Sequence, residues 1–598
     1  MSDEIRHECA VAMVVLRRPP SATDDFGGTK LSLLLEKQHN RGQDGAGAAI
    51  LRHNPEFGAP PYQVFKSASS TPLADVLGAI AKRARGKADA VSDAAHVCHG
   101  GFGRNAERVF LGHLRYATYG RSDVAFCHPF VHGSSALAHT FMLAGNFNLT
   151  NTAELFERYR GSGAFPTSRA DGYLITELVA HGLETGKNLA DAISSALSSA
   201  DGAWTLVGAT GAGEAFAVRD PHGIRPGYFL VNDDVAVVAS ERPAIQAAFD
   251  VSPESVKELP PGKALVISPD GGISWHSLAD SCCETSVGSE KRSCSFERIY
   301  FSRANDADIH RERRALGAAL APQILEAADS PMEDIFFSYI PNSARIAFHG
   351  LLEELFGMAL VRHSVPRFGE IAVKDAKFRT FIADAAARRE FYRHVYDVTY
   401  GLVRPGADTL VVLDDSIVRG NTMKNAILPM LDRLGPKRIV IASSAPPIRY
   451  PDCYGIDMST LGELVAFRAL VNLLGKDAER ELRDALMGDE RNPLEALYAR
   501  FSEKEHSSEI ARLLTPPGMK AEIAVVFQTV PALRRCLQGA DSGDRPPDGW
   551  QPVGQRPDDG ERRIGDWYFT GDYPTPGGYR VLRKALLNYL ERNTARSY

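Results

Sequence analysis

The sequence lacks several features that would place a protein in a special class. Its 598 residues contain only eight cysteines, far below the density of a small secreted domain held together by disulfide bonds. No apolar run is long enough to span a membrane, and Met1 to Glu8 are too short and polar for a secretory signal. The net charge of −6 gives no basic surface for a nucleic acid. We therefore expect a cytoplasmic protein with no membrane or nucleic-acid partner.

The composition that remains is that of an ordinary globular protein, with 44% hydrophobic and 24% charged residues. Up to about residue 275, short β-like runs alternate with turns and a few helices, which predicts layered sheets with flanking helices. From residue 294 strands and helices alternate, which predicts a parallel sheet. We treat residues 53–106 as an insertion and residues 466–598 as a helical C-terminal extension with a flexible loop at 538–561.

The most informative segment is a strand, a loop and a helix between residues 410 and 434. Leu410 to Leu413 read as a buried strand, Asp414 and Asp415 stand at its carboxyl end, and an apolar helical pattern begins at Met423. Ligands of open α/β sheets lie beyond the carboxyl ends of strands. The small loop residues offer backbone N–H groups to a phosphate, whereas adjacent carboxylates suit sugar hydroxyls or a divalent cation. Together they indicate a phosphorylated ribose; an ordinary Asp-Asp turn is the simpler alternative.

This segment resembles the ribose-phosphate motif of type I phosphoribosyltransferases, which bind phosphoribosyl pyrophosphate. The resemblance implies that Asp414 and Asp415 hold the ribose hydroxyls. It implies that the 5′-phosphate lies in the loop formed by Ser416, Ile417, Val418, Arg419, Gly420, Asn421 and Thr422. Ser343 follows a strand where the family usually has Pro-Asp-Ser-Gly and is a candidate metal or pyrophosphate ligand. Lys374 and Lys377 either belong to a loop that closes over the pyrophosphate or are solvated surface charges.

The N-terminal half carries a second set of motifs. Cys9 begins the first apolar run, and four polar segments follow it in order: Gln38 to Gly47, Gly112 to Thr118, Gly145 to Asn151 and Ser168 to Asp171. A cysteine on a core strand is usually structural, but this order resembles the class II glutamine amidotransferases. Their catalytic domain is an N-terminal-nucleophile hydrolase, whose mature chain begins with the cysteine.

The resemblance assigns a role to each polar residue. Cys9 would be the nucleophile, activated by its own α-amino group once residues 1–8, a propeptide, are removed. Asn146 and the backbone N–H of Phe147 would form the oxyanion hole. Arg115 would bind the α-carboxylate of glutamine and Asp171 its α-ammonium group, although these two could instead form a structural ion pair. Arg41 either helps to bind glutamine or only orients its loop.

Three positions depart from the pattern of that family. Ala10 stands where glycine is usual, Phe147 stands in place of the glycine of Asn-Gly-Asn, and His128 stands in place of the glutamine of Gln-Pro-Phe. None of the three changes removes a catalytic group. A backbone donor survives at Phe147 only if this residue can adopt the required φ and ψ angles.

Both sets of motifs occur in this order in one family, the glutamine phosphoribosylpyrophosphate amidotransferases. This resemblance implies a four-layer αββα N-terminal-nucleophile hydrolase domain at residues 9–275 and a phosphoribosyltransferase domain at 294–465. Ammonia released at Cys9 would pass through an internal channel and displace pyrophosphate from the ribose. The resemblance also implies Mg²⁺ held by Ser343, Asp414 and Asp415, purine nucleotides as inhibitors, and a homo-oligomer.

Two alternative functions and one further cofactor have to be considered. Another class II amidotransferase would lack the Asp414-Asp415 loop, and a non-catalytic nucleotide-binding regulator would have no use for a glutaminase half. Some members of the family carry an iron–sulfur cluster, which needs four thiolates. The corresponding segment here, Trp567 to Pro574, contains no cysteine. Cys294 and Cys453 are only two ligands, so we expect no cluster.

Overall fold

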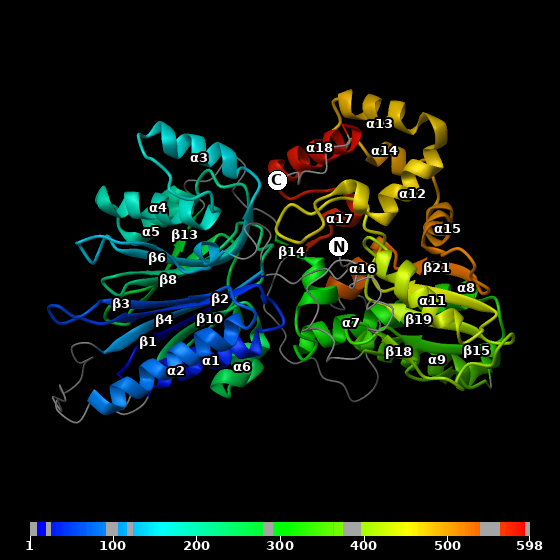
Figure 1. Cartoon of the computed structure of the whole chain (residues 1–598), viewed down its shortest axis with the longest axis horizontal. Helices are drawn as coiled ribbons and strands as arrows, with labels where there is room; N and C mark the ends of the chain where they lie inside the picture. The colour runs from blue at the N-terminus through cyan, green and yellow to red at the C-terminus, as the bar shows by residue number, and fades with distance from the viewer. Residues whose placement is uncertain are drawn as a thin grey trace.

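The computed structural model describes residues 9–19, 25–90, 106–116, 123–278, 291–362, 364–374, 396–538 and 563–591. The expected propeptide at residues 1–8 lies outside this part, as do Lys377 and nearly all of the loop expected at 538–561. Within these ranges no helix combines the length and the hydropathy needed to cross a bilayer. Figure 1 shows two stacked sheets on one side of the molecule and a smaller sheet with a group of C-terminal helices on the other.

Within the described residues, the first half of the chain forms two antiparallel sheets. Across the larger sheet the order is β11 (Lys257–Glu258), β9 (Tyr228–Val231), β10 (Val235–Ala239), β1 (Ala10–Leu16), β4 (Glu107–Arg115), β2 (Gly45–Arg52) and β3 (Tyr62–Ser67). Across the smaller sheet it is β13 (Ile273–Ser277), β12 (Lys263–Ile267), β8 (Ala215–Arg219), β7 (Gly202–Thr210), β6 (Phe141–Leu149) and β5 (Phe130–His132).

The two sheets face each other and helices cover their outer faces. In β1, Val11 and Met13 point into the core between the sheets, whereas Ala12 and Val14 point toward helices, as the two-residue period of a strand requires. The larger sheet is covered by α1 (Phe26–Lys37), α2 (Pro72–Ala90) and α6 (Arg242–Phe249), and the smaller one by α3 (Thr152–Gly161), α4 (Asp171–Glu184) and α5 (Leu189–Leu197). This is the predicted four-layer αββα arrangement. The expected insertion at 53–106 supplies β3 and α2.

The second half contains the predicted parallel sheet. Its order is β16 (Arg367–Phe368), β15 (Ile335–Tyr339), β19 (Thr409–Asp414), β20 (Arg438–Ser443) and β21 (Glu522–Phe527). In β19, Leu410 and Val412 pack on one side of the sheet, and Val411 and Leu413 pack on the other. Strand β21 lies beyond residue 465, where the sequence placed the domain boundary. The segment expected to be a helical extension therefore also contributes an edge strand, because Ile523 to Phe527 fit a half-buried position beside β20.

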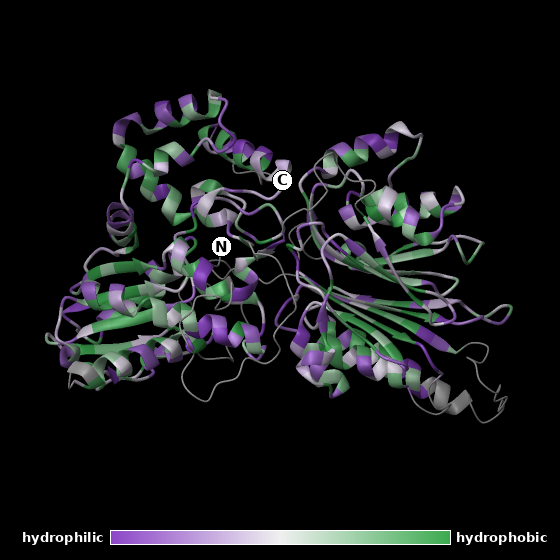
Figure 2. Ribbon diagram, turned by 180° about the vertical axis from the view of Figure 1, so that it is seen from behind, coloured by the Kyte–Doolittle hydropathy of each residue, from purple (hydrophilic) through white to green (hydrophobic). Residues whose placement is uncertain are grey.

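Helices on both sides bury the faces of this sheet. On one face lie α8 (Ala321–Ala328) and α9 (Arg345–Arg362), and on the other the π-helical turn η7 (Met423–Ile427), α11 (Leu428–Asp432), α12 (Val465–Leu474) and α15 (Glu503–Leu514). Further helices of this half pack in a separate hydrophobic cluster: α7 (Ala307–Ala319), α13 (Ala478–Met487), α14 (Glu495–Tyr498), α16 (Val530–Gln538), α17 (Trp567–Thr570) and α18 (Pro576–Leu590). In Figure 2 the central strands are coloured as hydrophobic, and many helices carry one hydrophobic and one hydrophilic side.

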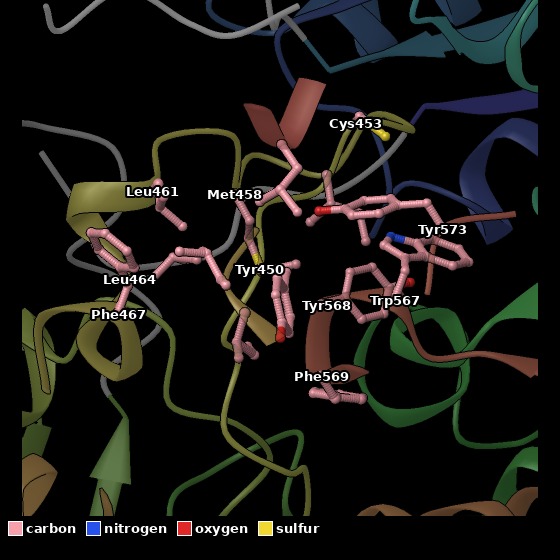
Figure 3. Close-up of a cluster of buried hydrophobic side chains, with 14 of the residues drawn as sticks. Tyr450, Cys453, Met458, Leu461, Leu464, Phe467, Trp567, Tyr568, Phe569 and Tyr573 are labelled. Atoms are coloured by element: carbon pink, nitrogen blue, oxygen red, sulfur yellow. The ribbon is translucent and has the colours of Figure 1, made fainter. Parts of the chain in front are cut away.

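An aromatic cluster joins the C-terminal helices to the rest of the second half. Tyr450, Trp567, Tyr568 and Tyr573 are buried together, and Figure 3 shows their rings converging from two separate segments. The hydroxyl of Tyr568 lies 2.7 Å from the sulfur of Cys294. Beside this cluster, β22 (Arg563–Gly565) pairs in parallel with β14 (Arg292–Cys294), which ties the end of the chain to the start of its second half.

Candidate active site

The sulfur of Cys9 lies at the start of β1, against the end of β4. The backbone N–H of Tyr116 donates a hydrogen bond to Cys9 Sγ over 3.3 Å. Burial raises the pKa of the Cys9 thiol to about 11, although this hydrogen bond and the charge of Arg115 act in the opposite direction. The thiol is therefore protonated at neutral pH and needs a base before it can act as a nucleophile.

Asn146 and Phe147 are neighbours in β6. Asn146 is 3% exposed, and its side-chain Nδ2 is buried without a hydrogen-bond partner among the described residues. A buried amide donor costs about 1–3 kcal/mol when nothing accepts its hydrogen bond, so Asn146 Nδ2 is a candidate donor to an anionic oxygen. Phe147 does not have a positive φ angle, so its backbone does not require glycine.

Asp171 is the first residue of α4, where the backbone N–H of Gly172 donates to its Oδ1 over 2.8 Å. Burial raises the pKa of Asp171 to about 6 in spite of that hydrogen bond. Arg115 ends β4 and is 5% exposed, and its guanidinium lies 5.8 Å from the ring centre of Phe126. Asp171 and Arg115 both act electrostatically on Cys9, which places the two residues around the sulfur.

Arg41 is buried between two carboxylates. Its Nε donates to Glu241 over 2.7 Å, and its two terminal nitrogens donate to Glu297 over 3.0 and 2.7 Å. Glu241 precedes α6, whereas Glu297 begins the π-helical turn η4 (Glu297–Phe301) in the second half of the chain. The planar guanidinium group is thus used to join the two halves.

The two adjacent aspartates lie at the carboxyl end of β19, beside the segment that follows β15. Ser343 and Ser416 both donate hydrogen bonds to Asp415, the latter over 2.9 Å. Asp415 is 6% exposed, and burial raises the pKa of its carboxyl group although both hydroxyls and the Arg313 cation oppose this. A buried carboxylate of this kind gains from hydroxyl donors or from a cation.

The loop after these aspartates leads into a helix, as predicted. Gly420 has a φ angle of 77°, and a side chain there would overlap Leu514. Arg419 turns its guanidinium toward the segment that follows β20: it donates to Glu463 over 2.7 Å and to the backbone oxygen of Asp457 over 3.0 Å. Lys374 ends β17 (Ala372–Lys374), which pairs with β18 (Tyr396–Val398).

One cavity of about 1010 Å³ extends between the two halves. On the N-terminal side it is lined by Asp44 and by Tyr116, the hydrogen-bond partner of Cys9. On the C-terminal side it is lined by Ser343, Asp414, Asp415, the loop from Ser416 to Gly420, and Thr422. The fold thus places the aspartate loop and Tyr116, whose backbone N–H binds the thiol, at one shared cavity.

Comparisons with known proteins agree with this geometry. A family model described as a glutamine amidotransferase domain matches residues 129–247. The amidophosphoribosyltransferase of Archaeoglobus fulgidus is 30% identical over 377 residues, which cover 62% of this chain and 76% of that protein. The amidophosphoribosyltransferase of Bacillus subtilis is 31% identical over 372 residues, covering 60% and 69%. The chain belongs to the amidophosphoribosyltransferase family.

Solved structures extend the likeness of this amidophosphoribosyltransferase family member to the whole fold. One is the B. subtilis glutamine phosphoribosylpyrophosphate amidotransferase complexed with ADP and GMP, with a TM-score of 0.64, 24% identity and coverage of 95% of this chain and 97% of that one. Another is described as the allosteric regulatory enzyme of purine biosynthesis, with a TM-score of 0.65, 23% identity and coverage of 95% and 96%.

Sequence reasoning missed several residues of the site. Glu241 and Glu297, the partners of Arg41, lie 200 and 256 residues away from it in the chain. Arg313, which lines the cavity near Asp415, sits in a helix without a recognisable motif. An arginine and two glutamates occur too often in sequences to mark such partners.

The residues present can be compared with the cofactors of the family. Ser343, Asp414 and Asp415 offer the oxygen ligands that Mg²⁺ prefers. Among the residues that the structure describes, no three His, Cys, Asp or Glu side chains are placed to hold a metal ion, so substrate oxygens would have to complete the set. The thiol of Cys294 contacts the Tyr568 hydroxyl in the aromatic cluster, which does not suit an iron–sulfur ligand.

Proposed function

We propose that this protein is the enzyme that converts phosphoribosyl pyrophosphate, glutamine and water to 5-phosphoribosylamine, glutamate and pyrophosphate, the first committed step of purine biosynthesis. The observation that carries the proposal is the single cavity lined by Tyr116 on one side and by Asp414, Asp415 and the following loop on the other. Ammonia is small and volatile, and a cavity shared by the two halves shortens its path from one site to the other.

The glutaminase site becomes active once residues 1–8 are removed, which leaves Cys9 with a free α-amino group. The α-amino group of Cys9 then takes the proton from the thiol, and the sulfur attacks the carboxamide carbon of glutamine. Asn146 Nδ2 and the Phe147 N–H stabilise the oxygen that becomes negative. The α-ammonium group returns the proton to the departing nitrogen, which leaves as ammonia, and water hydrolyses the thioester to glutamate.

Charged side chains orient glutamine in this reaction. Arg115 binds its α-carboxylate, and Asp171 binds its α-ammonium group. Of the two roles considered for Arg41 we propose the second, orientation of its loop, because its donors already serve Glu241 and Glu297.

In the second reaction, ammonia attacks C1 of the ribose and pyrophosphate leaves. Asp414 and Asp415 bind the ribose hydroxyls, and the loop of residues 416–422 binds the 5′-phosphate through its backbone N–H groups. Lys374 and Lys377 neutralise charge on the pyrophosphate. Bound Mg²⁺ would supply further neutralisation of that leaving group, held by Ser343, Asp414, Asp415 and substrate oxygens.

The proposal also covers the regulation and assembly of the enzyme. The B. subtilis relative in complex with ADP and GMP supports purine nucleotides as inhibitors of this enzyme. We further propose that the enzyme is cytoplasmic and forms a homo-oligomer, and that it contains no iron–sulfur cluster.

The deciding experiment uses the variant Cys9→Ala. Glutamine-dependent release of pyrophosphate from phosphoribosyl pyrophosphate should fall to background, whereas the ammonia-dependent reaction should stay within about twofold of the wild type, because only the first step needs the thiol. Loss of both reactions would contradict separate sites. A regulator without catalytic activity would release no pyrophosphate with either nitrogen source.

Mass analysis of the N-terminus of the purified protein tests whether the α-amino group of Cys9 can be the base. Active enzyme should begin at Cys9, because an amide nitrogen cannot accept the thiol proton. Full glutamine-dependent activity of a chain that retains Met1 to Glu8 would refute the free-amine mechanism.

A further inference from the structure

Two buried histidines lie directly behind the segment that carries Asn146. His113 comes from β4, and His128 precedes β5. Their rings are stacked with centres 4.0 Å apart and planes 8° from parallel. Neither ring belongs to the mechanism described above, so the pair needs another explanation.

Both rings bind the same residue, Gly145. Its backbone N–H donates to His128 Nδ1 over 3.1 Å, and its carbonyl oxygen lies 3.0 Å from His113 Nε2. A carbonyl oxygen can only accept, so His113 Nε2 carries a proton; an N–H group can only donate, so His128 Nδ1 does not. The peptide groups on both sides of Gly145 are thereby held in place, and the second of them leads into Asn146.

His128 also contacts the other parts of the glutamine site. Its ring centre lies 5.8 Å from that of Phe147, and a side chain on Gly172 would come within 3.4 Å of His128 Cε1. Gly172 follows Asp171, the proposed partner of the substrate ammonium group. The imidazole ring of His128 thus touches the segments that carry the oxyanion hole and Asp171.

Gly145 is suited to this arrangement because it has no side chain. A Cβ atom there would lie 2.6 Å from Phe147 Cδ1, since residues two apart in a strand point to the same face. Phe147 can therefore fold back beside the histidines while its backbone stays in β6. Two of the three departures from the family pattern, at residues 128 and 147, thus lie side by side.

We infer that His128 is a positioning residue for glutamine hydrolysis: with His113 it fixes the Gly145 backbone, and thereby aims Asn146 Nδ2 and the Phe147 N–H at the oxygen of the tetrahedral intermediate. This inference rests on the proposed function, because it presupposes that these two donors form the oxyanion hole. His128 touches neither the thiol nor the substrate in this role.

The test compares His128→Leu with His128→Asn. Leucine fills the space but cannot accept the Gly145 hydrogen bond, whereas asparagine offers an acceptor oxygen close to the position of Nδ1. For His128→Leu we expect glutamine-dependent kcat to fall about 10- to 100-fold while KM for glutamine changes less than about threefold, since misplaced oxyanion donors act on the transition state. His128→Asn should restore most of the rate.

The ammonia-dependent reaction is the internal control, and it should match that of the wild type in both variants. An unchanged glutamine-dependent kcat in His128→Leu, or an equal loss in His128→Asn, would overturn the inference. Parallel loss of both reactions together with a lower unfolding temperature would also overturn it, because it would mean a merely structural role.

A second pair of variants covers the case in which His128→Leu does not fold. His113→Leu removes the donor to the Gly145 carbonyl, and His113→Gln retains a donor near Nε2, so the first should be slow with glutamine and the second close to the wild type. Equal rates in the two would contradict the inference. Failure of the proposed function is recognised separately, by glutamine-dependent activity that survives in Cys9→Ala.

Discussion

At the scale of single residues, Asp171 is a carboxylate whose surroundings oppose its charge. Burial raises its pKa to about 6, which places its titration within reach of ordinary assays. A carboxyl group with a raised pKa is neutral below that value, and a neutral carboxyl cannot pair with the ammonium group of glutamine. The protonation state of this residue therefore predicts a specific pH dependence.

The value of kcat/KM for glutamine should decline in two stages as the pH falls. In the first stage the Cys9 α-amine becomes protonated below about pH 7.7–8.0, and kcat/KM should fall about tenfold per pH unit. In the second stage Asp171 becomes protonated below about pH 6, and kcat/KM should fall about a further tenfold per unit. In Asp171→Asn the second stage should be absent, on top of a raised KM at all pH values. A wild-type profile with a single stage down to pH 5 would contradict the role of Asp171.

Asp415 is another carboxylate whose pKa is raised by burial, and the hydroxyls of Ser343 and Ser416 donate hydrogen bonds to it. The change Asp415→Asn removes the charge and one acceptor from the proposed ribose site. We expect the ammonia-dependent release of pyrophosphate to fall about 100-fold or more, together with the glutamine-dependent reaction. Asp489→Asn, at an exposed position outside the cavity lining, is the matched control. Unchanged ammonia-dependent turnover in Asp415→Asn would contradict the assignment.

At the scale of elements, helices α7 and α9 cross with their backbones in unusually close approach. A side chain on Gly350 of α9 would overlap the backbone of Arg314, and one on Gly317 of α7 would overlap Ala347. Helix α9 begins two residues after Ser343, so its packing against α7 fixes the helix that this serine precedes. Farther along α9, Gly357 is exposed and a Cβ there would meet nothing within 4 Å.

Gly350 and Gly357, which both lie in α9, provide a matched pair of variants. Gly350→Ala should lower the free energy of unfolding by about 1–3 kcal/mol or more, because the helices must move apart. Gly357→Ala should raise it by about 0.5–1 kcal/mol, because alanine favours the helix and no atom is in its way. Urea-induced unfolding of the two variants measures the difference. Equal effects would mean that the helices do not cross closely at Gly350.

Elements differ in how well the sequence predicts them. Strand β10 (Val235–Ala239) is one continuous apolar run, and β20 (Arg438–Ser443) contains another from Ile439 to Ala442, so both strands are visible in the sequence. The sequence of strand β6 shows only a polar motif, because Gly145, Asn146 and Asn148 interrupt its apolar pattern. Strands with and without an apolar pattern pair their backbones alike. Only the side-chain pattern is visible in a sequence, so strands of the second kind are missed.

At the scale of the whole molecule, Arg41 joins the two halves. It pairs with Glu241 from the first half and with Glu297 from the second, all of them buried. Burial raises the pKa of Glu297 and the Arg41 cation lowers it, with a net fall, so the pair remains ionised at neutral pH. Removal of one partner would leave buried charge without compensation.

The variant Arg41→Met distinguishes the two roles considered for this residue. Loss of the ion pairs should lower the free energy of unfolding by about 3–5 kcal/mol and reduce both the glutamine- and the ammonia-dependent reactions. Unfolding is measured alongside the two assays, with the exposed change Arg480→Met as a control. A raised KM for glutamine with unchanged stability would instead make Arg41 a glutamine-binding residue.

The sequence by itself determined the local pieces: the strand, aspartates and loop around Asp414, the cysteine before the first strand, and the order of the two halves. These could be predicted because neighbours in the chain fold into a strand, a turn or a helix largely on their own pattern. Only the tertiary structure decided that Ser343 binds Asp415, that two histidines hold Gly145, and that one cavity lies between the two halves. Such pairs are formed by packing between elements that lie far apart in the chain, and no local pattern records which surfaces will meet.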